Sequence, residues 1–131
     1  MSVSSELQSN GVGVVTVDYP PVNALPIDGW FAIADEVTDL GKNSSTRSII
    51  LRSEGRGFNA GVDIKEIQSR EGHDALVEVN RACFAAFKAI YDCEVPVISA
   101  VNGFCLGGGV GLVGNSDIIV ASDDAYFGVP E

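Results

Sequence analysis

Short apolar runs alternate along this chain with longer segments that have apolar residues at helical spacing, and this alternation limits the folds open to it. The runs are rich in branched residues, as buried strands are. Strands that alternate with helices are typical of βαβ units around a mostly parallel sheet. We therefore predict an α/β fold without an internal repeat. The expected strands are 12–18, 47–52, 96–101 and 117–122, and the expected helices are 28–40, 63–69 and 73–93.

The charge balance excludes several classes of partner. The 131 residues carry a formal net charge of −10 with only eight Lys and Arg residues, whereas proteins that bind the phosphate backbone of nucleic acids cluster basic residues. No apolar run is long enough to span a membrane, and residues 1–10 lack the basic and apolar regions of a signal peptide. We therefore expect a cytoplasmic protein that binds neither nucleic acid nor membrane.

The cysteines and the single histidine give little support for metal binding or for a nucleophilic thiol. Cys83, Cys93 and Cys105 form no CxxC pattern and have no histidine at metal-ligand spacing. His73 lies in a polar stretch, where we expect it to be solvated in front of a helix. We interpret the cysteines as small core residues and expect no metal site.

Two glycine-rich segments, 57–61 and 107–109, each follow an expected strand and lead into a helix. The first N–H groups of a helix have no partner within it and, together with the helix dipole, form an anion site. Two such turns that face each other would present two N–H groups to one oxygen, which is the geometry of an oxyanion hole. The alternative is that the glycines only allow tight turns.

Gly109, Gly111 and Gly114 also match the G-x-G-x-x-G pattern of dinucleotide-binding proteins. That pattern requires its first glycine directly after a strand and a full crossover helix behind it. Here Gly109 lies eight residues after Val101, and the next expected strand begins near residue 117, which leaves no room for the helix. We therefore reject a dinucleotide site. No Gly-Lys-Ser/Thr follows either glycine segment, which excludes a P-loop.

The segments GFNAGVDIKE (57–66) and AVNGFCLGGGVGL (100–112), with PPVNAL (20–25) before them, resemble the crotonase superfamily, also called the enoyl-CoA hydratase/isomerase superfamily. The resemblance extends over nearly the whole chain. It implies a spiral of ββα units followed by a helical C-terminal region, in longer subunits that assemble as homotrimers or dimers of trimers. We therefore expect residues 1–131 to be the N-terminal part of a single crotonase-like domain, cut after its last residue.

The resemblance also implies an acyl-CoA substrate and residues that bind it. The N–H groups of Val62 and Gly108 would form the oxyanion hole for the thioester carbonyl. Coenzyme A is part of the substrate, so no separate cofactor is expected. Many relatives carry a Lys or Arg in the first CoA-contacting loop, where this chain has a Pro-Val pair, so we expect one phosphate contact fewer. The CoA-binding residues implied in this way are Val22, Asn23, Ala24, Ala60, Asp63, Ile64 and Lys65.

The chain departs from the hydratases of the superfamily at one of their two glutamates. The resemblance places the first of this pair at Gly111 and the second at Glu131. A single carboxylate can still accept a proton or activate water, so Glu131 is the expected catalytic residue. The motifs resemble most the actinobacterial crotonase-like hydrolases that open a ring of a steroid-derived acyl-CoA. Two alternatives stay open: a 2-enoyl-CoA hydratase of fatty-acid β-oxidation, and a non-catalytic CoA-binding or assembly subunit.

Other polar residues near the motifs are candidates for the role of the missing carboxylate. We expect Asp63 to be the N-cap of helix 63–69 rather than a catalytic acid. Lys65 is either solvated or close to a CoA phosphate, and Asp117 is expected to be structural. The remaining polar candidates are Asn59, Glu66 and Asn115.

Overall fold

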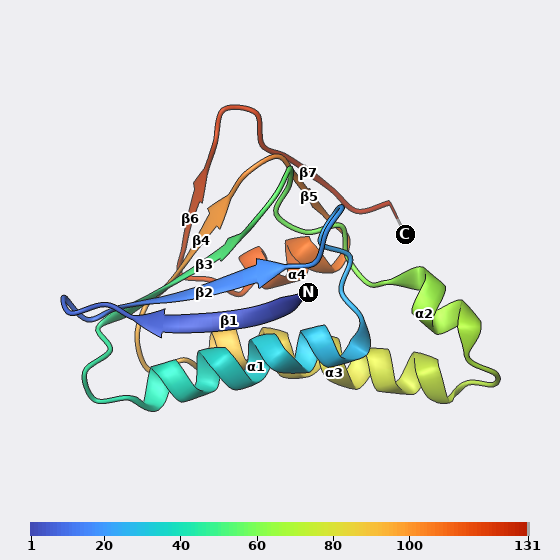
Figure 1. The fold of residues 1–131 in the computed structure, drawn as a ribbon, viewed down its shortest axis with the longest axis horizontal. Helices are drawn as coiled ribbons and strands as arrows, with labels where there is room; N and C mark the ends of the chain where they lie inside the picture. Colours follow the sequence, from blue (N-terminus) through green and yellow to red (C-terminus); the bar gives the residue numbers. More distant parts are fainter. Residues whose placement is uncertain (131) are drawn as a thin grey trace.

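The computed structural model describes residues 1–130, whose strands and helices alternate along the chain (Figure 1). This confirms the predicted α/β class, and each predicted strand and helix is present within two residues of its expected bounds. The elements are β1 (Ser2–Leu7), β2 (Val12–Asp18), α1 (Ile27–Lys42), β3 (Ser48–Ser53), α2 (Ile64–Ser69), α3 (Asp74–Tyr91), β4 (Val97–Val101), β5 (Phe104–Leu106), α4 (Gly108–Gly114), β6 (Ile118–Ala121) and β7 (Tyr126–Gly128).

The main sheet has five strands in the order β1-β2-β3-β4-β6. β1 pairs antiparallel with β2, and the other neighbours are parallel. Parallel neighbours need a crossover connection, which α1 supplies between β2 and β3 and α3 supplies between β3 and β4. A small parallel sheet of β5 and β7 follows β4 along the chain. The second glycine segment connects β5 directly to α4.

The sequence does not predict β1, and its composition explains why. Val3 and Leu7 are its only apolar residues, and most of the strand is exposed. β1 joins the sheet through backbone hydrogen bonds to β2, and the turn between the two strands contains Gly11, which has a φ of 88°. An exposed edge strand needs no apolar alternation, so hydrophobic periodicity does not reveal it. The strands β5 and β7 were also not predicted, since three residues are too few to show a period.

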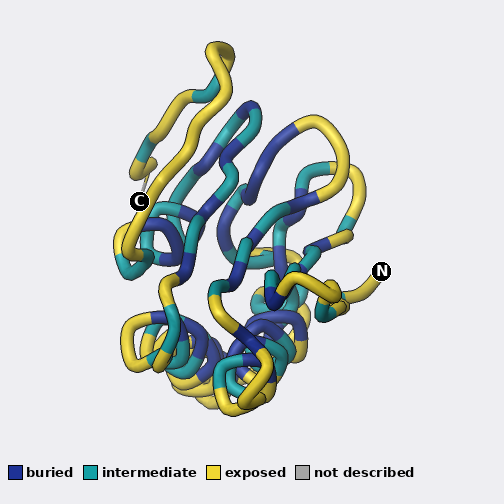
Figure 2. The backbone as a smooth tube through the Cα atoms, turned by 90° about the vertical axis from the view of Figure 1, so that its left-hand side faces the viewer, coloured by how far each residue is buried: buried dark blue, intermediate teal, exposed yellow. Residues whose placement is uncertain are grey.

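The helices α1 and α3 lie side by side and cover one face of the main sheet (Figure 1). Fully buried Ala82 and Ala86 on α3 have small side chains, which allow close approach to the neighbouring elements. Many of the residues coloured as buried in Figure 2 belong to these helices and to the strands that they cover. The largest fully buried side chains are Trp30, Phe58, Leu25, Ile27, Ile33, Ile49, Leu51, Ile90 and Leu112.

The C-terminal part of the described chain is much more exposed than the rest (Figure 2). Ile118, Ile119 and Val120 are 51%, 48% and 58% exposed although β6 pairs with β4. The predicted strand is therefore present, but residues 1–130 do not bury its apolar side chains. Separately, none of the described helices combines the length and the apolar character that crossing a bilayer requires.

Ile49 in β3 tests the packing of the core, because its side chain is fully buried. We expect Ile49→Ala to lower the free energy of unfolding by about 2–5 kcal/mol and Ile49→Val by about 0.5–1.5 kcal/mol, since the larger deletion leaves the larger cavity. Urea unfolding of the full-length protein measures both losses. Equal losses from the two variants would contradict the packing described here.

Candidate functional site

The two glycine-rich segments meet beside β5. Asn59 and Cys105 form a parallel bridge, in which the Leu106 N–H donates to the Asn59 carbonyl at 2.8 Å. The Phe58 N–H donates to the Phe104 carbonyl at 2.9 Å. The first segment therefore runs along the strand that leads into the second. A Cβ atom on Gly61 would lie 3.5 Å from the Gly108 nitrogen, so the two turns are in direct contact.

The two predicted oxyanion donors are the backbone N–H groups of Val62 and Gly108. Leu25 holds the backbone on both sides of Val62, because its N–H donates to Gly61 at 2.9 Å and its carbonyl accepts from Asp63 at 2.8 Å. Neither Val62 nor Gly108 donates its N–H to any acceptor within residues 1–130. Both residues are partly exposed. Because unpaired backbone donors in folded proteins are usually satisfied by water or a ligand, the two N–H groups remain candidates for the predicted oxyanion site.

The glycines at this point do more than allow a turn. Gly61 has a φ of 89° and Gly107 a φ of 53°, which is the left-handed region that side chains disfavour. Gly108 is restricted by packing instead, since a Cβ there would lie 2.6 Å from Cη2 of the buried Trp30 ring. The close approach of α1 therefore requires glycine at the position of the second donor.

The structure brings the two predicted CoA-binding segments together at one open cavity of about 420 Å³. Val22 and Ala24 line it from the first loop, and Asp63 and Lys65 line it from the start of α2. Its other lining residues are Met1, Tyr19, Pro20, Pro21 and Pro26.

Three other predicted CoA-binding residues do not line this cavity. Ile64 is 60% exposed, and Ala60 donates its N–H to the Asn23 carbonyl at 3.3 Å. Asn23 is buried, with a φ of 54°, a conformation that Asn tolerates better than most residues. Its amide donates to the carbonyls of Glu54 and Gly57 at 2.7 and 2.9 Å. The Asn23 side chain therefore fixes the loop, a role that sequence reasoning missed.

The cavity combines a neutral phenol with a free cation. Burial raises the pKa of Tyr19, and the negative charge of Asp28 raises it further, so the phenol keeps its proton at neutral pH. Lys65 has no carboxylate within ion-pair distance in the described part of the chain. An anionic ligand at this cavity therefore meets no phenolate and can pair with Lys65.

The acidic residues of α2 already have structural partners. The Asp63 carboxylate accepts from the N–H groups of Lys65 and Glu66 at 3.0 and 3.4 Å, which confirms the N-cap interpretation. Glu66 accepts from the Ile27 N–H at 2.8 Å and pairs with Arg70 at 3.1 Å. Glu66 thus caps the start of α1, and neither carboxylate is placed as a free proton acceptor.

The other polar candidates near the second segment are also engaged. The Asn115 amide donates to the Gly111 carbonyl at 2.7 Å, and the Asp117 carboxylate accepts from the Val97 N–H at 2.8 Å, the structural role expected for it. Burial raises the pKa of the Cys105 thiol to about 11. That thiol is therefore protonated at neutral pH and is not a nucleophile there.

The position of the missing glutamate is filled by an aromatic ring. A Cβ atom on Gly111 would lie 2.3 Å from Cζ of Phe87 in α3. Phe87 also packs edge-on against Trp30, with ring centroids 5.9 Å apart and an interplanar angle of 84°. A side chain at residue 111 would therefore require the Phe87 ring to move. The other predicted carboxylate, Glu131, lies outside the described residues.

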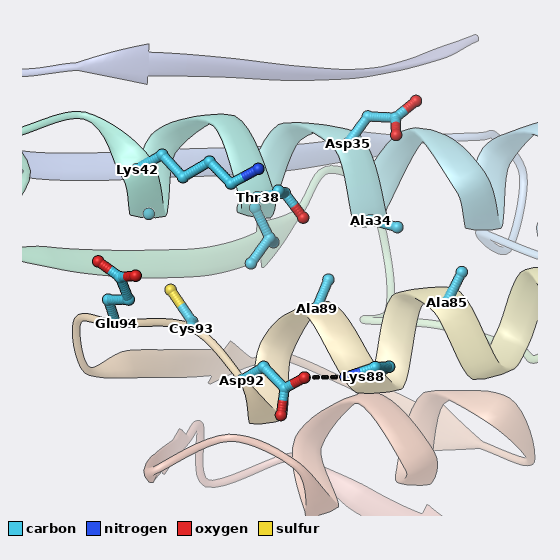
Figure 3. Close-up of a pocket in the computed structure, with 12 residues that line it drawn as sticks. Ala34, Asp35, Thr38, Lys42, Ala85, Lys88, Ala89, Asp92, Cys93 and Glu94 are labelled. Atoms are coloured by element: carbon cyan, nitrogen blue, oxygen red, sulfur yellow. Dashed lines mark hydrogen bonds and ion pairs between the residues drawn. The ribbon is translucent and has the colours of Figure 1, made fainter.

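A second cavity, of about 400 Å³, lies between α1 and α3 (Figure 3). Its walls carry charged side chains, among them the ion pair of Lys88 and Asp92, together with Cys93. None of the predicted site residues lines it. The candidate site is therefore the pair of glycine segments with the cavity beside the first loop.

Comparison with known proteins gives three consistent similarities. The family model described as Enoyl-CoA hydratase/isomerase matches residues 7–131. A (7aS)-7a-methyl-1,5-dioxo-2,3,5,6,7,7a-hexahydro-1H-indene-carboxyl-CoA hydrolase of Mycobacterium tuberculosis is 66% identical and covers 100% of this chain and 53% of its own length. The hydrolase of the same name from Rhodococcus jostii is 64% identical, over 100% of this chain and 51% of its own length.

The fold of the chain is also similar to that of solved structures. The crystal structure of an enoyl-CoA hydratase from Mycobacterium avium subsp. paratuberculosis matches with a TM-score of 0.83 at 26% identity, over 96% of this chain and 49% of that one. The chain spans about half the length of the curated relatives it matches.

Gly111 and Gly114 provide a matched test of the packing under the second glycine segment. We expect Gly111→Ala to destabilise the protein by about 1–3 kcal/mol, because the new methyl group overlaps the Phe87 ring. Gly114→Ala, in the same helix, has no atom within 4 Å of its new Cβ and should stabilise by up to about 1 kcal/mol through helix propensity. Thermal unfolding measures both changes. Phe87→Ala removes the ring, so adding Gly111→Ala to that variant should cost little further stability. If Gly111→Ala costs as much in the Phe87→Ala background as in the wild type, the clash with Phe87 is contradicted.

Proposed function

The chain belongs to the enoyl-CoA hydratase/isomerase family, as its motifs predict, and we propose that the protein containing it hydrolyses a C–C bond in a cyclic, steroid-derived acyl-CoA. The observation that carries the proposal is the pair of N–H groups of Val62 and Gly108, which have no acceptor within residues 1–130; Asp63, directly after Val62, lines the cavity formed by the two predicted CoA-binding segments. The identity of 66% and 64% to two hydrolases of a hexahydroindene-carboxyl-CoA supports the choice of substrate class.

In this proposal Val62 and Gly108 donate to the thioester oxygen of the substrate. The oxygen gains negative charge when the thioester becomes an enolate, and fixed donors stabilise that charge without reorganising. One such donor typically contributes about 3–4 kcal/mol to the transition state. Gly107 and Gly61 hold both donors in backbone conformations that are set by the fold, so the site is formed before the substrate arrives.

The proposed reaction is a hydrolysis of a ketone that lies beta to the thioester. Water adds to the ring carbonyl carbon, and the bond from that carbon to the carbon beside the thioester breaks. The electron pair moves into the thioester as an enolate, a proton completes the carbon, and the former ketone becomes a carboxylic acid. Glu131 is the proposed base that takes the proton from water. One carboxylate is sufficient for this step.

Coenzyme A binds as part of the substrate in this proposal, without a separate cofactor. Its adenine end is assigned to Ala60, Asp63, Ile64 and Lys65, and the first loop contributes Val22, Asn23 and Ala24. Lys65 is the cation at this cavity without a carboxylate partner in residues 1–130, which fits an anionic ligand. We further propose that the full-length protein is cytoplasmic and assembles as a homotrimer or a dimer of trimers.

Hydration of a 2-enoyl-CoA is disfavoured by the packing at Gly111. A hydratase pair needs a second carboxylate to hold the water molecule, whereas the space beside Gly111 contains the Phe87 ring. A non-catalytic CoA-binding role requires no carboxylate at all. It is disfavoured by the identity of 66% to a hydrolase and by the free donor pair.

The substrate assignment predicts a specific product. We expect the full-length protein to convert the hexahydroindene-carboxyl-CoA of its relatives into a product that has gained one water and keeps its thioester. Mass spectrometry of the reaction follows this change, and the loss of enoyl absorbance follows hydration of crotonyl-CoA in parallel. Rapid hydration of crotonyl-CoA without ring opening would identify a hydratase. Tight binding of acyl-CoA without turnover of either substrate would identify a non-catalytic subunit.

Glu131→Gln tests the proposed base, because the amide keeps the size and hydrogen bonding of the side chain but cannot accept a proton. We expect kcat for ring opening to fall roughly 10²-fold or more, the usual scale for a general base. Asp123→Asn is the matched control, since it neutralises an exposed carboxylate eight positions earlier in the sequence that has no proposed role. Turnover of Glu131→Gln close to that of the control would assign the proton transfer to another group.

A further inference from the structure

We propose that Asn59 is a positioning residue that holds the two oxyanion donors of the site in register. The inference rests on the proposed function, since it concerns the same donor pair. Asn59 is 1% exposed, so its side chain does not reach solvent. Its effect on the reaction therefore has to pass through the backbone groups that it binds.

The side chain of Asn59 fixes the first turn from both ends. Its amide oxygen accepts from the Gly61 N–H at 2.8 Å, which closes a short turn in front of Val62. Its amide nitrogen donates to the Asn23 carbonyl at 2.9 Å. The turn that carries the first donor is thereby tied to the loop that borders the CoA cavity.

The same residue also contacts the second turn. The backbone carbonyl of Asn59 accepts from the N–H of Leu106 at 2.8 Å, and Leu106 lies two residues before Gly108. A Cβ atom on Gly109 would lie 2.9 Å from the Asn59 Cβ and 3.1 Å from its amide oxygen. Helix α4 therefore begins in van der Waals contact with the Asn59 side chain. One buried residue thus sets where Val62 and Gly108 stand relative to each other.

This arrangement explains why an amide suits the position. The side chain must accept from one backbone N–H and donate to one backbone carbonyl in a space that excludes water. An Asn amide provides one group of each kind on a short stem. Replacing it leaves a buried N–H and a buried carbonyl without these partners. The turn can then relax, which displaces the Val62 donor from the thioester oxygen.

The keto–enolate equilibrium of bound acetoacetyl-CoA measures the donor pair directly, since the enolate absorbs in the near ultraviolet and requires no turnover. We expect Asn59→Ala in the full-length protein to lower this equilibrium constant by roughly 10–100-fold, the scale for misplacing a group by about 1 Å. Affinity for CoA itself should change much less than the enolate equilibrium, since Lys65 and the hydrogen bonds of the Asn23 side chain to Glu54 and Gly57 remain. Asn59→Ser keeps an acceptor for the Gly61 N–H and should lie between Asn59→Ala and the wild type.

Asn102→Ala is the matched control. It removes another Asn amide that donates to a backbone carbonyl, that of Gly55, at 3.1 Å, but it touches neither donor turn. It should leave the enolate equilibrium unchanged. A residue with a merely structural role would lower the melting temperature without shifting this equilibrium.

The outcomes separate the two proposals. If the wild type stabilises the enolate and folded Asn59→Ala does so equally well, the positioning role is overturned and the proposed function stands. If the wild type binds acetoacetyl-CoA without stabilising its enolate, or does not bind it, the proposed function is overturned and this inference with it. Should Asn59→Ala fail to fold, Asn59→Ser decides: a several-fold fall supports the role, and no fall overturns it.

Discussion

The parallel contact between residues 57–62 and β5 is the constraint on which the rest of the site depends. Two backbone hydrogen bonds, from Phe58 to Phe104 and from Leu106 to Asn59, align the first glycine segment with the strand that leads into the second. Both turns therefore begin from the same pair of hydrogen-bonded segments, and these backbone hydrogen bonds set the distance between the two turns. The side chain of Asn59 then holds the first turn in place on this pair of segments. Fixed positions of this kind are what the proposed donor pair needs to stabilise a charge that exists only briefly.

A packing constraint connects the fold to the chemistry. Trp30 from α1 and Phe87 from α3 meet edge-on beneath α4, and each ring lies where a Cβ atom of that helix would be. Gly108 thereby presents its N–H close to the helical layer. The same rings leave no room for a side chain at Gly111. One aromatic pair thus restricts both positions of α4, so in the proposed function the second donor and the absence of a second carboxylate depend on α1, α3 and α4 together.

The sequence predicts the elements that carry a hydrophobic period and misses those held by the backbone alone. β2 and β3 are apolar and buried, whereas Ser4 and Ser5 in β1 show no pattern. For the site, the motifs identify the two turns and the N-cap at Asp63. They do not identify the partners of Asn59 or the place of the Phe87 ring. Hydrogen bonds between residues more than thirty positions apart, and the ring that fills a given space, depend on tertiary geometry that a local pattern does not contain.

If an acidic chain is to bind the anionic substrate proposed here, its electrostatic interactions have to be considered at long range and at contact distance separately. The formal net charge of −10 repels coenzyme A at long range, but salt screens such repulsion beyond about 8 Å at physiological ionic strength. At contact distance the interaction is set by individual groups, namely Lys65 at the cavity and the N–H donors of Val62 and Gly108. Backbone N–H groups carry no net charge and do not titrate, so in the proposed function they would act at any pH at which the protein is folded. A net charge of −10 is therefore compatible with the proposed function.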